Sequence, residues 1–309
     1  MPKSHTSLLR VSVRAPTMVR KTRKMSKIPW IIAIPSYKRA ETLRDKTLAT
    51  LVKYNIDPKR IHVFVANSDE YASYKSILKP GTYGHMHIAV PGMAAVRNYI
   101  TAFFPINTPI FNMDDDIKGF LEWSATANRN ERPLRSLEAA IDRGFAEAMK
   151  PRTVNGKSTR FRLFGFYPVA NGFFMRGGEP TTDLRYIIGA VWGIINPGSK
   201  ALTVTIDDKE DYLRSVIMYI LDGGVLRFNN IAPETAYYKE PGGMQEERTM
   251  NRITASAEAM VTAFPDLVKI NLTKRSGMPE VRLRDSRPAD EREFGAAVLH
   301  KYHLPHLTK

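Results

Sequence analysis

The chain has 309 residues, of which 43% are hydrophobic and 25% charged, and it contains no cysteine. This composition is that of an ordinary globular protein, and no apolar run approaches the roughly 20 residues that span a bilayer. The lack of cysteine excludes disulfides, thiolate metal sites and cysteine nucleophiles, and it fits a reducing cytoplasm.

The net charge of +15 is unevenly distributed along the chain. Residues 1–27 hold eight lysines and arginines and no acid, which leaves +7 on the remaining residues. We expect residues 1–27 to form a basic, disordered arm, and Met18 or Met25 is an alternative start of the protein. A basic body suggests a polyanionic partner such as nucleic acid. Solubility together with a site for anionic diphosphates is the alternative explanation.

Strands and helices alternate from residue 28 to residue 116. Short apolar runs predict buried strands at 29–35, 61–66, 87–90 and 110–113, separated by helical patterns at 39–54, 70–78 and 93–104. This alternation predicts an α/β fold with a mainly parallel central sheet flanked by helices. Ligands of such sheets bind beyond the carboxyl ends of the strands, where Ser36, residues 67–69 and residues 114–116 lie.

The second half of the chain has a different pattern. Strands are predicted at 161–168, 187–195 and 225–228, and helices at 209–222 and 246–263. We therefore expect one domain over residues 28–245 that is large enough to be a catalytic domain. A helical and basic extension at 246–309 would pack on the same domain.

Three consecutive aspartates, Asp114, Asp115 and Asp116, follow an apolar strand. Like charges this close are costly unless a cation or a donor compensates them, and hard carboxylate oxygens suit Mg²⁺ or Mn²⁺. If the strand continues, Asp114 and Asp116 point to the same side and Asp115 faces away, so the first and third are the candidate metal ligands. A solvated acidic turn or a helix N-cap is the alternative.

Three motifs together resemble the GT-A glycosyltransferases, in particular the family-2-like enzymes. They are the strand and turn at 34–39 (I-P-S-Y-K-R), the helix start at 92–98 (G-M-A-A-V-R-N) and the aspartate strand at 110–116 (I-F-N-M-D-D-D). The resemblance covers roughly residues 28–240. It implies a GT-A fold that uses a nucleotide-diphosphate sugar, such as a UDP-sugar, and a divalent metal ion.

The resemblance also implies roles for the matched positions. Pro35, Ser36, Tyr37 and Arg39 would line the nucleotide pocket, with Asn67, Ser68 or Asp69 near the base. Arg97 would face the diphosphate, Asn98 would orient the ribose or the aspartate loop, and Asp114 and Asp115 would contact the donor. In the simpler interpretation, Pro35 only ends a strand, Tyr37 only packs and Arg97 lies on a helix surface.

A second acidic cluster, residues 207–211, precedes the predicted helix at 209–222. Family-2-like enzymes carry an E-D pair here that supplies the base for the acceptor, and Glu210-Asp211 matches it. Asp211 is the first candidate, with Glu210 beside it and Asp208 next. The alternative is that these acids favour a helix N-terminus through its dipole. A retaining enzyme would need no such base.

The whole chain looks most like the TET-associated glycosyltransferases of bacteriophages. That resemblance implies transfer of a hexose to a 5-hydroxymethylpyrimidine, 5-hydroxymethylcytosine first, in phage DNA in the host cytoplasm. Arginines and aromatics interleave at 160–176, which suits nucleic-acid binding or a core strand equally. Two other hypotheses remain: a GT-A enzyme acting on a glycan, protein or small molecule, and a non-catalytic nucleic-acid-binding protein.

Overall fold

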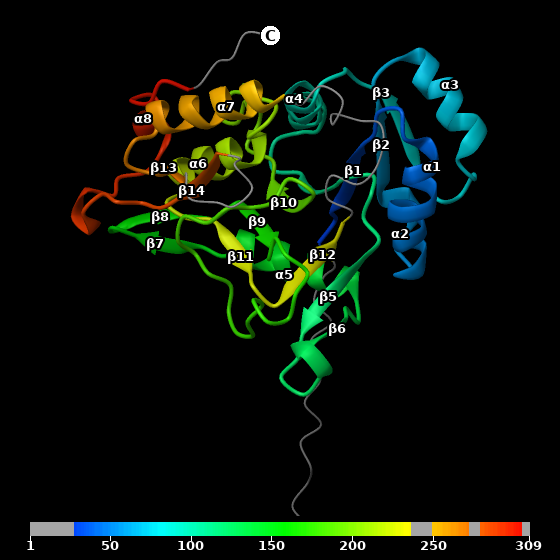
Figure 1. The fold of residues 1–309 in the computed structure, drawn as a ribbon, viewed down its shortest axis with the longest axis horizontal. Helices are drawn as coiled ribbons and strands as arrows, with labels where there is room; N and C mark the ends of the chain where they lie inside the picture. Colours follow the sequence, from blue (N-terminus) through cyan, green and yellow to red (C-terminus); the bar gives the residue numbers. More distant parts are fainter. Residues whose placement is uncertain (1–27, 236–248, 272–278, 305–309) are drawn as a thin grey trace, which may run out of the picture.

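The computed structural model describes residues 28–235, 249–271 and 279–304 (Figure 1). The predicted arm at 1–27 and the predicted domain boundary at 245/246 lie outside the described residues. Within those three ranges, no helix is both long enough and apolar enough to cross a membrane.

A seven-stranded sheet in the order β11-β9-β10-β4-β1-β2-β3 forms the centre of the fold. β10 runs antiparallel to both of its neighbours, and the other neighbouring pairs are parallel. The predicted α/β class with a mainly parallel sheet is therefore confirmed. The strands are β1 (Ile31–Pro35), β2 (Ile61–Val65), β3 (His85–Ile88), β4 (Pro109–Met113), β9 (Leu163–Phe166), β10 (Val191–Ile195) and β11 (Leu226–Phe228).

Helices cover both faces of this sheet because successive strand residues point to opposite sides. Ile32 and Ile34 belong to one apolar core together with Leu43 and Phe145, while Ala33 belongs to a second core with helix residues of the other face. The first face is covered by α1 (Ala40–Thr42), a π-helical turn (Leu43–Leu48), α2 (Ala49–Lys53) and α5 (Leu137–Met149). The second is covered by α4 (Met93–Phe103) and α6 (Glu210–Asp222). α3 (Ser68–Ile77) follows β2.

Smaller elements complete the domain. One small sheet has the order β12 (Ile231–Glu234), β5 (Gly119–Trp123) and β6 (Glu131–Pro133), and β7 (Arg152–Val154) pairs with β8 (Lys157–Thr159). The C-terminal part contains α7 (Met250–Ala263), β13 (Val268–Asn271), β14 (Glu280–Leu283) and α8 (Ala296–Leu299). Met260 and Val281 lie in the same core as α6, so these elements pack on the second face of the sheet (Figure 1).

The strand predicted at 187–195 is shorter in the structure, where β10 begins only at Val191. The backbone of Gly189 explains the difference. Its N–H donates to the Asp211 carboxylate, and its carbonyl accepts from Arg97, so neither group takes part in the sheet. The segment before β10 therefore serves the site described next.

Candidate functional site

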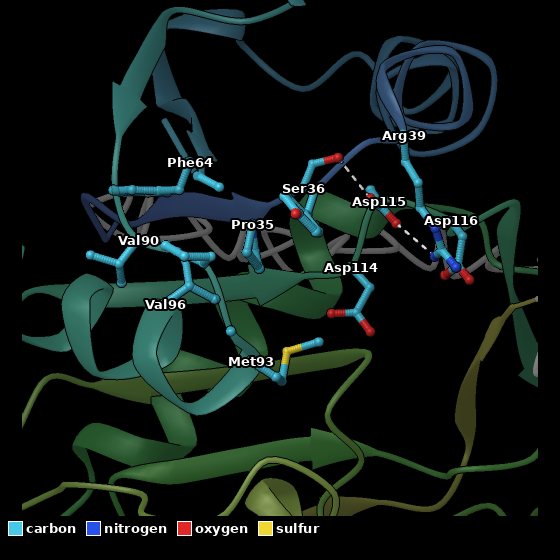
Figure 2. Close-up of a pocket in the computed structure, with 14 residues that line it drawn as sticks. Pro35, Ser36, Arg39, Phe64, Val90, Met93, Val96, Asp114, Asp115 and Asp116 are labelled. Carbon is cyan, nitrogen blue, oxygen red and sulfur yellow. Dashed lines mark hydrogen bonds and ion pairs between the residues drawn. The ribbon is translucent and has the colours of Figure 1, made fainter. Parts of the chain in front are cut away.

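A pocket opens at the carboxyl ends of β1, β2 and β4, as expected for a parallel α/β sheet (Figure 2). It encloses about 630 Å³ of empty space, counted out to its open mouth. One side is apolar and the other carries the aspartates. The lining residues are Pro35, Ser36, Tyr37, Arg39, Phe64, Ala66, Val90, Pro91, Gly92, Met93, Val96, Asp114, Asp115 and Asp116. The pocket thus brings together residues of all three sequence motifs, those at 34–39, 92–98 and 110–116.

Asp115 is buried and turned toward the turn that follows β1 (Figure 2). The Ser36 hydroxyl donates to its Oδ2 at 2.7 Å, and the Arg39 guanidinium lies 3.5 Å from its Oδ1. Burial raises the pKa of Asp115 to about 7, although Ser36 and Arg39 favour the charged form. Asp115 therefore holds the turn after β1 in place.

Tyr74, which the sequence did not identify, completes this arrangement from α3. Its buried hydroxyl lies 2.7 Å from the Ser36 hydroxyl and accepts the backbone N–H of Arg39 at 3.0 Å. Because Ser36 donates to Asp115, the Tyr74 hydroxyl must be the donor to Ser36. Burial raises the pKa of Tyr74, so the hydroxyl stays protonated. A chain of donors therefore runs from the backbone of Arg39 to Asp115.

Asp114 points the other way, toward Met93 (Figure 2). Its Oδ1 accepts from the Arg97 guanidinium at 2.5 Å, and its side chain remains 29% exposed whereas that of Arg97 is 3% exposed. Thr47 holds the turn: its hydroxyl donates to the Asp114 carbonyl at 2.7 Å and accepts the Ile117 N–H at 2.9 Å. Asp114 is thus an accessible carboxylate on a rigid support.

The carboxylates fit a cation that is shared with a ligand. Asp114 and Asp116 both line the pocket and are neither fully buried nor fully exposed. In the described ranges, no group of three His, Cys, Asp or Glu side chains is arranged to hold a metal ion. Mg²⁺ and its relatives are commonly bound by one or two carboxylates with waters and substrate phosphates completing the shell. The residues therefore suit a metal–diphosphate site better than an all-protein cage.

A buried ion-pair chain leads from the pocket to α6. The Arg97 Nε lies 3.9 Å from Glu210 Oε1, and the Arg214 Nη1 donates to Glu210 Oε2 at 2.5 Å. Glu210, Arg97 and Arg214 are all at least 95% buried, and the Arg214 guanidinium stacks on Trp192 at 3.8 Å. Burial raises the pKa of Glu210, against the effect of the two arginines. Glu210 is thus engaged inside the protein.

Asp211 is the more accessible acid of the pair. Its Oδ2 accepts from the Tyr186 hydroxyl at 2.6 Å and from the Gly189 N–H at 3.2 Å, and its Oδ1 accepts its neighbour's N–H, that of Tyr212. Gly189 also accepts from Arg97 at 3.0 Å. The backbone of Gly189 therefore connects Asp211 with Arg97, which in turn bonds Asp114.

Asp208 and Asp207 face the C-terminal elements instead. Arg252 on α7 lies 3.3 Å from Asp208 and 3.6 Å from Asp207. Asp207, which sequence reasoning did not single out, also accepts the N–H of Ala94 at 2.9 Å and so caps α4. Asp207 therefore secures the helix that carries Arg97, and Asp208 pairs with α7.

Three other candidates from the sequence lie outside the pocket lining. Both ends of the Asn98 amide bond the backbone of Val204, at 2.7 and 2.9 Å. Asn67 is exposed and caps α3 by accepting the N–H of Glu70, and Asp69 is exposed in the first turn of that helix. The side chains of Asn98 and Asn67 therefore support the surrounding backbone.

No protein-family model matches the chain, and no curated protein sequence matches it. Solved structures with a similar fold include S. aureus TarS 1–349, with a TM-score of 0.39 and 12% identity over 66% of this chain and 59% of that one. The galactosyltransferase LgtC with donor and acceptor sugar analogues has a TM-score of 0.36 and 12% identity, covering 63% and 72%. GalNAc-T7 with UDP, GalNAc and Mn²⁺ has a TM-score of 0.42 and 10% identity, covering 78% and 51%.

This chain thus spans about three-fifths of TarS 1–349, and 39% of a longer TarS chain. At these TM-scores and identities, the similarity carries no argument about activity. The case for function rests on the residues of the site.

Proposed function

We propose that the protein is a metal-dependent glycosyltransferase that moves a hexose from a UDP-sugar to 5-hydroxymethylcytosine, or a related 5-hydroxymethylpyrimidine, in phage DNA. The observation that carries this proposal is the pairing of accessible Asp114 with buried Arg97 at the floor of a strand-end pocket, one backbone unit away from Asp211. This arrangement supports a donor site and a candidate base on connected parts of one fold.

The donor would lie with its nucleotide against Pro35, Tyr37 and the apolar side of the pocket. Asp114 and Asp116 would hold Mn²⁺ or Mg²⁺, which stabilises the negative charge of the leaving diphosphate when bound. Arg97, whose side chain is 3% exposed and donates to Asp114, would orient that carboxylate toward the metal and the diphosphate.

Asp211 would act as the general base on the acceptor. Its carboxylate takes the hydroxymethyl proton while the acceptor oxygen forms a bond to the sugar anomeric carbon and the bond to the diphosphate breaks. Glu210 keeps Arg97 in position through their buried ion pair. This assignment applies to an inverting reaction, and we place the reaction in the host cytoplasm.

The +7 charge of the chain beyond residue 27 supports a polyanionic acceptor. A stacked base must leave the duplex for its hydroxymethyl group to reach both Asp211 and a bound donor. A glycan, protein or small-molecule acceptor is the second candidate, because the site chemistry on the donor side would be the same.

The test is to incubate the purified protein with Mn²⁺, a panel of UDP-sugars and duplex DNA containing 5-hydroxymethylcytosine, followed by mass spectrometry of the nucleosides. We expect a hexose mass on the modified nucleoside that disappears with EDTA, with Asp116→Ala and with Asp211→Asn. Exposed Glu258→Gln on α7 is the matched acidic control and should keep full activity.

Other outcomes separate the hypotheses. Transfer to sugar acceptors but not to modified DNA would support the second candidate. Failure to bind any nucleotide sugar, with no effect of metal, would support a non-catalytic nucleic-acid-binding protein. Full activity in Asp114→Ala/Asp116→Ala would refute the metal assignment.

A further inference from the structure

The hydroxyl of Tyr186 is directed at the candidate base by a rigid aromatic stack. The rings of Tyr186 and Tyr212 lie 4.2 Å apart with an angle of 22° between their planes, and Lys209 Nζ lies 5.2 Å from the Tyr212 ring. Tyr212 belongs to the first turn of α6, directly after Asp211. The stack therefore fixes the Tyr186 ring relative to the carboxylate with which its hydroxyl bonds at 2.6 Å.

The chain segment that carries Tyr186 is joined closely to the same helix turn. The Ile187 N–H donates to the Ser215 hydroxyl at 3.1 Å, and that hydroxyl donates to the Asp211 carbonyl at 2.7 Å. A side chain at Gly189 would come within 3.3 Å of Asp211 and 2.8 Å of Glu210. Only glycine therefore lets this segment pass close enough to deliver both a backbone N–H and the Tyr186 hydroxyl.

The donors occupy the two oxygens of Asp211 unequally. An ionised carboxylate offers about four lone-pair positions, two on each oxygen. Oδ2 uses both of its positions, for Tyr186 and Gly189, and Oδ1 uses one, for the N–H of Tyr212. One position on Oδ1 remains for an acceptor hydroxyl.

We propose that Tyr186 is a positioning residue that, with the Gly189 N–H, holds Asp211 so that Oδ1 takes the acceptor proton. This inference rests on the proposed role of Asp211 as the base. Tyr186 itself does not exchange a proton in this step: it donates to Oδ2 throughout, and the acceptor proton moves to Oδ1. Among the described residues, Glu210 and Arg214 are charged groups near Asp211. Arg97 bonds the same Gly189, and Lys209 lies over the Tyr212 ring; none of the four changes in the variants below.

Tyr186→Phe is the direct test because it keeps the stacked ring and removes only the donor. Loss of one charge-assisted hydrogen bond should lower kcat by roughly 10- to 100-fold and leave the KM for the UDP-sugar unchanged. The acidic limb of the pH–rate profile should move to higher pH, because the charged carboxylate has lost a donor.

Tyr219→Phe is the matched control. It removes a hydroxyl on the same helix that donates to another carboxylate, Asp285, at 2.7 Å, so the pH–rate profile should stay that of the wild type. A fluorinated tyrosine at position 186, whose more acidic hydroxyl is a stronger donor, should restore kcat and move the acidic limb to lower pH.

The outcomes separate this inference from the proposed function. An active wild type whose acidic limb is the same in Tyr186→Phe, or moves equally in Tyr219→Phe, overturns the role of Tyr186 alone. A wild type that binds UDP-sugar but transfers to no acceptor overturns the base assignment and this inference together. Thermal unfolding of each variant shows whether a lost rate reflects lost fold.

Discussion

The two acid clusters, 114–116 at the end of β4 and 210–211 at the start of α6, divide in the same manner. Each has one member that is buried and engaged by the protein, Asp115 and Glu210, whereas the other acids, Asp114 and Asp116 in one cluster and Asp211 in the other, remain partly accessible. The buried member supports the site and the accessible members are available for ligands. The members of a run of acids can therefore be assigned to ligand binding or to support only when the burial of each side chain is known.

The buried members differ in what compensates them. Asp115 accepts from the neutral Ser36 hydroxyl and faces Arg39 only at 3.5 Å, and its pKa is raised to about 7. Glu210 lies between two buried guanidiniums, those of Arg97 and Arg214. Replacing Asp115 removes a costly buried carboxyl, whereas replacing Glu210 leaves buried Arg214 without its counter-charge and Arg97 with Asp114 alone. The α6 cluster should therefore be the more sensitive of the two in stability.

The largest effects should come from Asp211→Asn and Glu210→Gln compared side by side. Asp211→Asn should lower kcat by roughly 10²- to 10⁴-fold, as expected for loss of a general base, with little change in stability. Glu210→Gln should lower the free energy of unfolding by about 3–5 kcal/mol, because it breaks a buried ion-pair chain. Urea unfolding measures the stability effect, and the transfer assay measures the rate effect. Equal losses of stability in the two variants would contradict the assignment of Glu210 to structural support and of Asp211 to catalysis.

A second comparison tests the aspartates after β4. Asp116→Asn should weaken the joint binding of Mn²⁺ and UDP by at least the roughly 10- to 100-fold that loss of a partner of a metal ligand costs. Asp115→Asn should leave that affinity within about threefold, because Asp115 contacts Ser36 and Arg39. Isothermal titration of UDP with and without Mn²⁺ gives both values. A larger loss in Asp115→Asn would reverse their roles.

The sequence was sufficient to predict the edge of the sheet on which the site lies. Alternating apolar strands and helices from 28 to 116 require parallel pairing, and parallel strands place Ser36 and Asp114 at one edge. It could not predict which acid is buried, because that depends on Ser36, 79 positions from Asp115, and on Tyr74, 38 positions from Ser36. Contacts of that separation leave no local pattern.

Two other differences have separate causes. No element was predicted for residues 117–160, although α5 carries a helical apolar pattern, with Leu137, Ile141, Gly144 and Phe145 buried, after the N-cap Ser136. That signal was present in the sequence. The long strand predicted at 187–195 reflects apolar residues alone, since nothing in them shows that the Gly189 backbone bonds side chains of α4 and α6.

A smaller effect is expected at the support of the aspartate turn. Thr47→Val removes a hydroxyl that joins the Asp114 carbonyl to the Ile117 N–H, so it should cost about 2 kcal/mol of unfolding free energy. Thr50→Val removes one hydrogen bond, to the Ile117 carbonyl, and should cost about 1 kcal/mol. Only Thr47→Val should also weaken Mn²⁺–UDP binding. Equal effects of the two on binding would show that the turn is held elsewhere.

The smallest expected effect concerns pH and lies away from both acid clusters. His62 on β2 bonds His87 at 3.0 Å and stacks on His85, and burial, then the charges of these two histidines, lowers its pKa to about 4. The folded state thus resists a proton that the unfolded state accepts near pH 6.5, so stability is full above pH 6.5 and falls between pH 6.5 and pH 4. Because the side chain is partly exposed, we expect a loss of about 1 kcal/mol rather than the full value of the shift.

His62→Asn should reduce this dependence of stability on pH in urea unfolding at pH 4.5 and 7. If the variant keeps the wild-type dependence, the acidic groups of the two clusters are its source, and the pH–rate profile of Tyr186→Phe must then be corrected for unfolding.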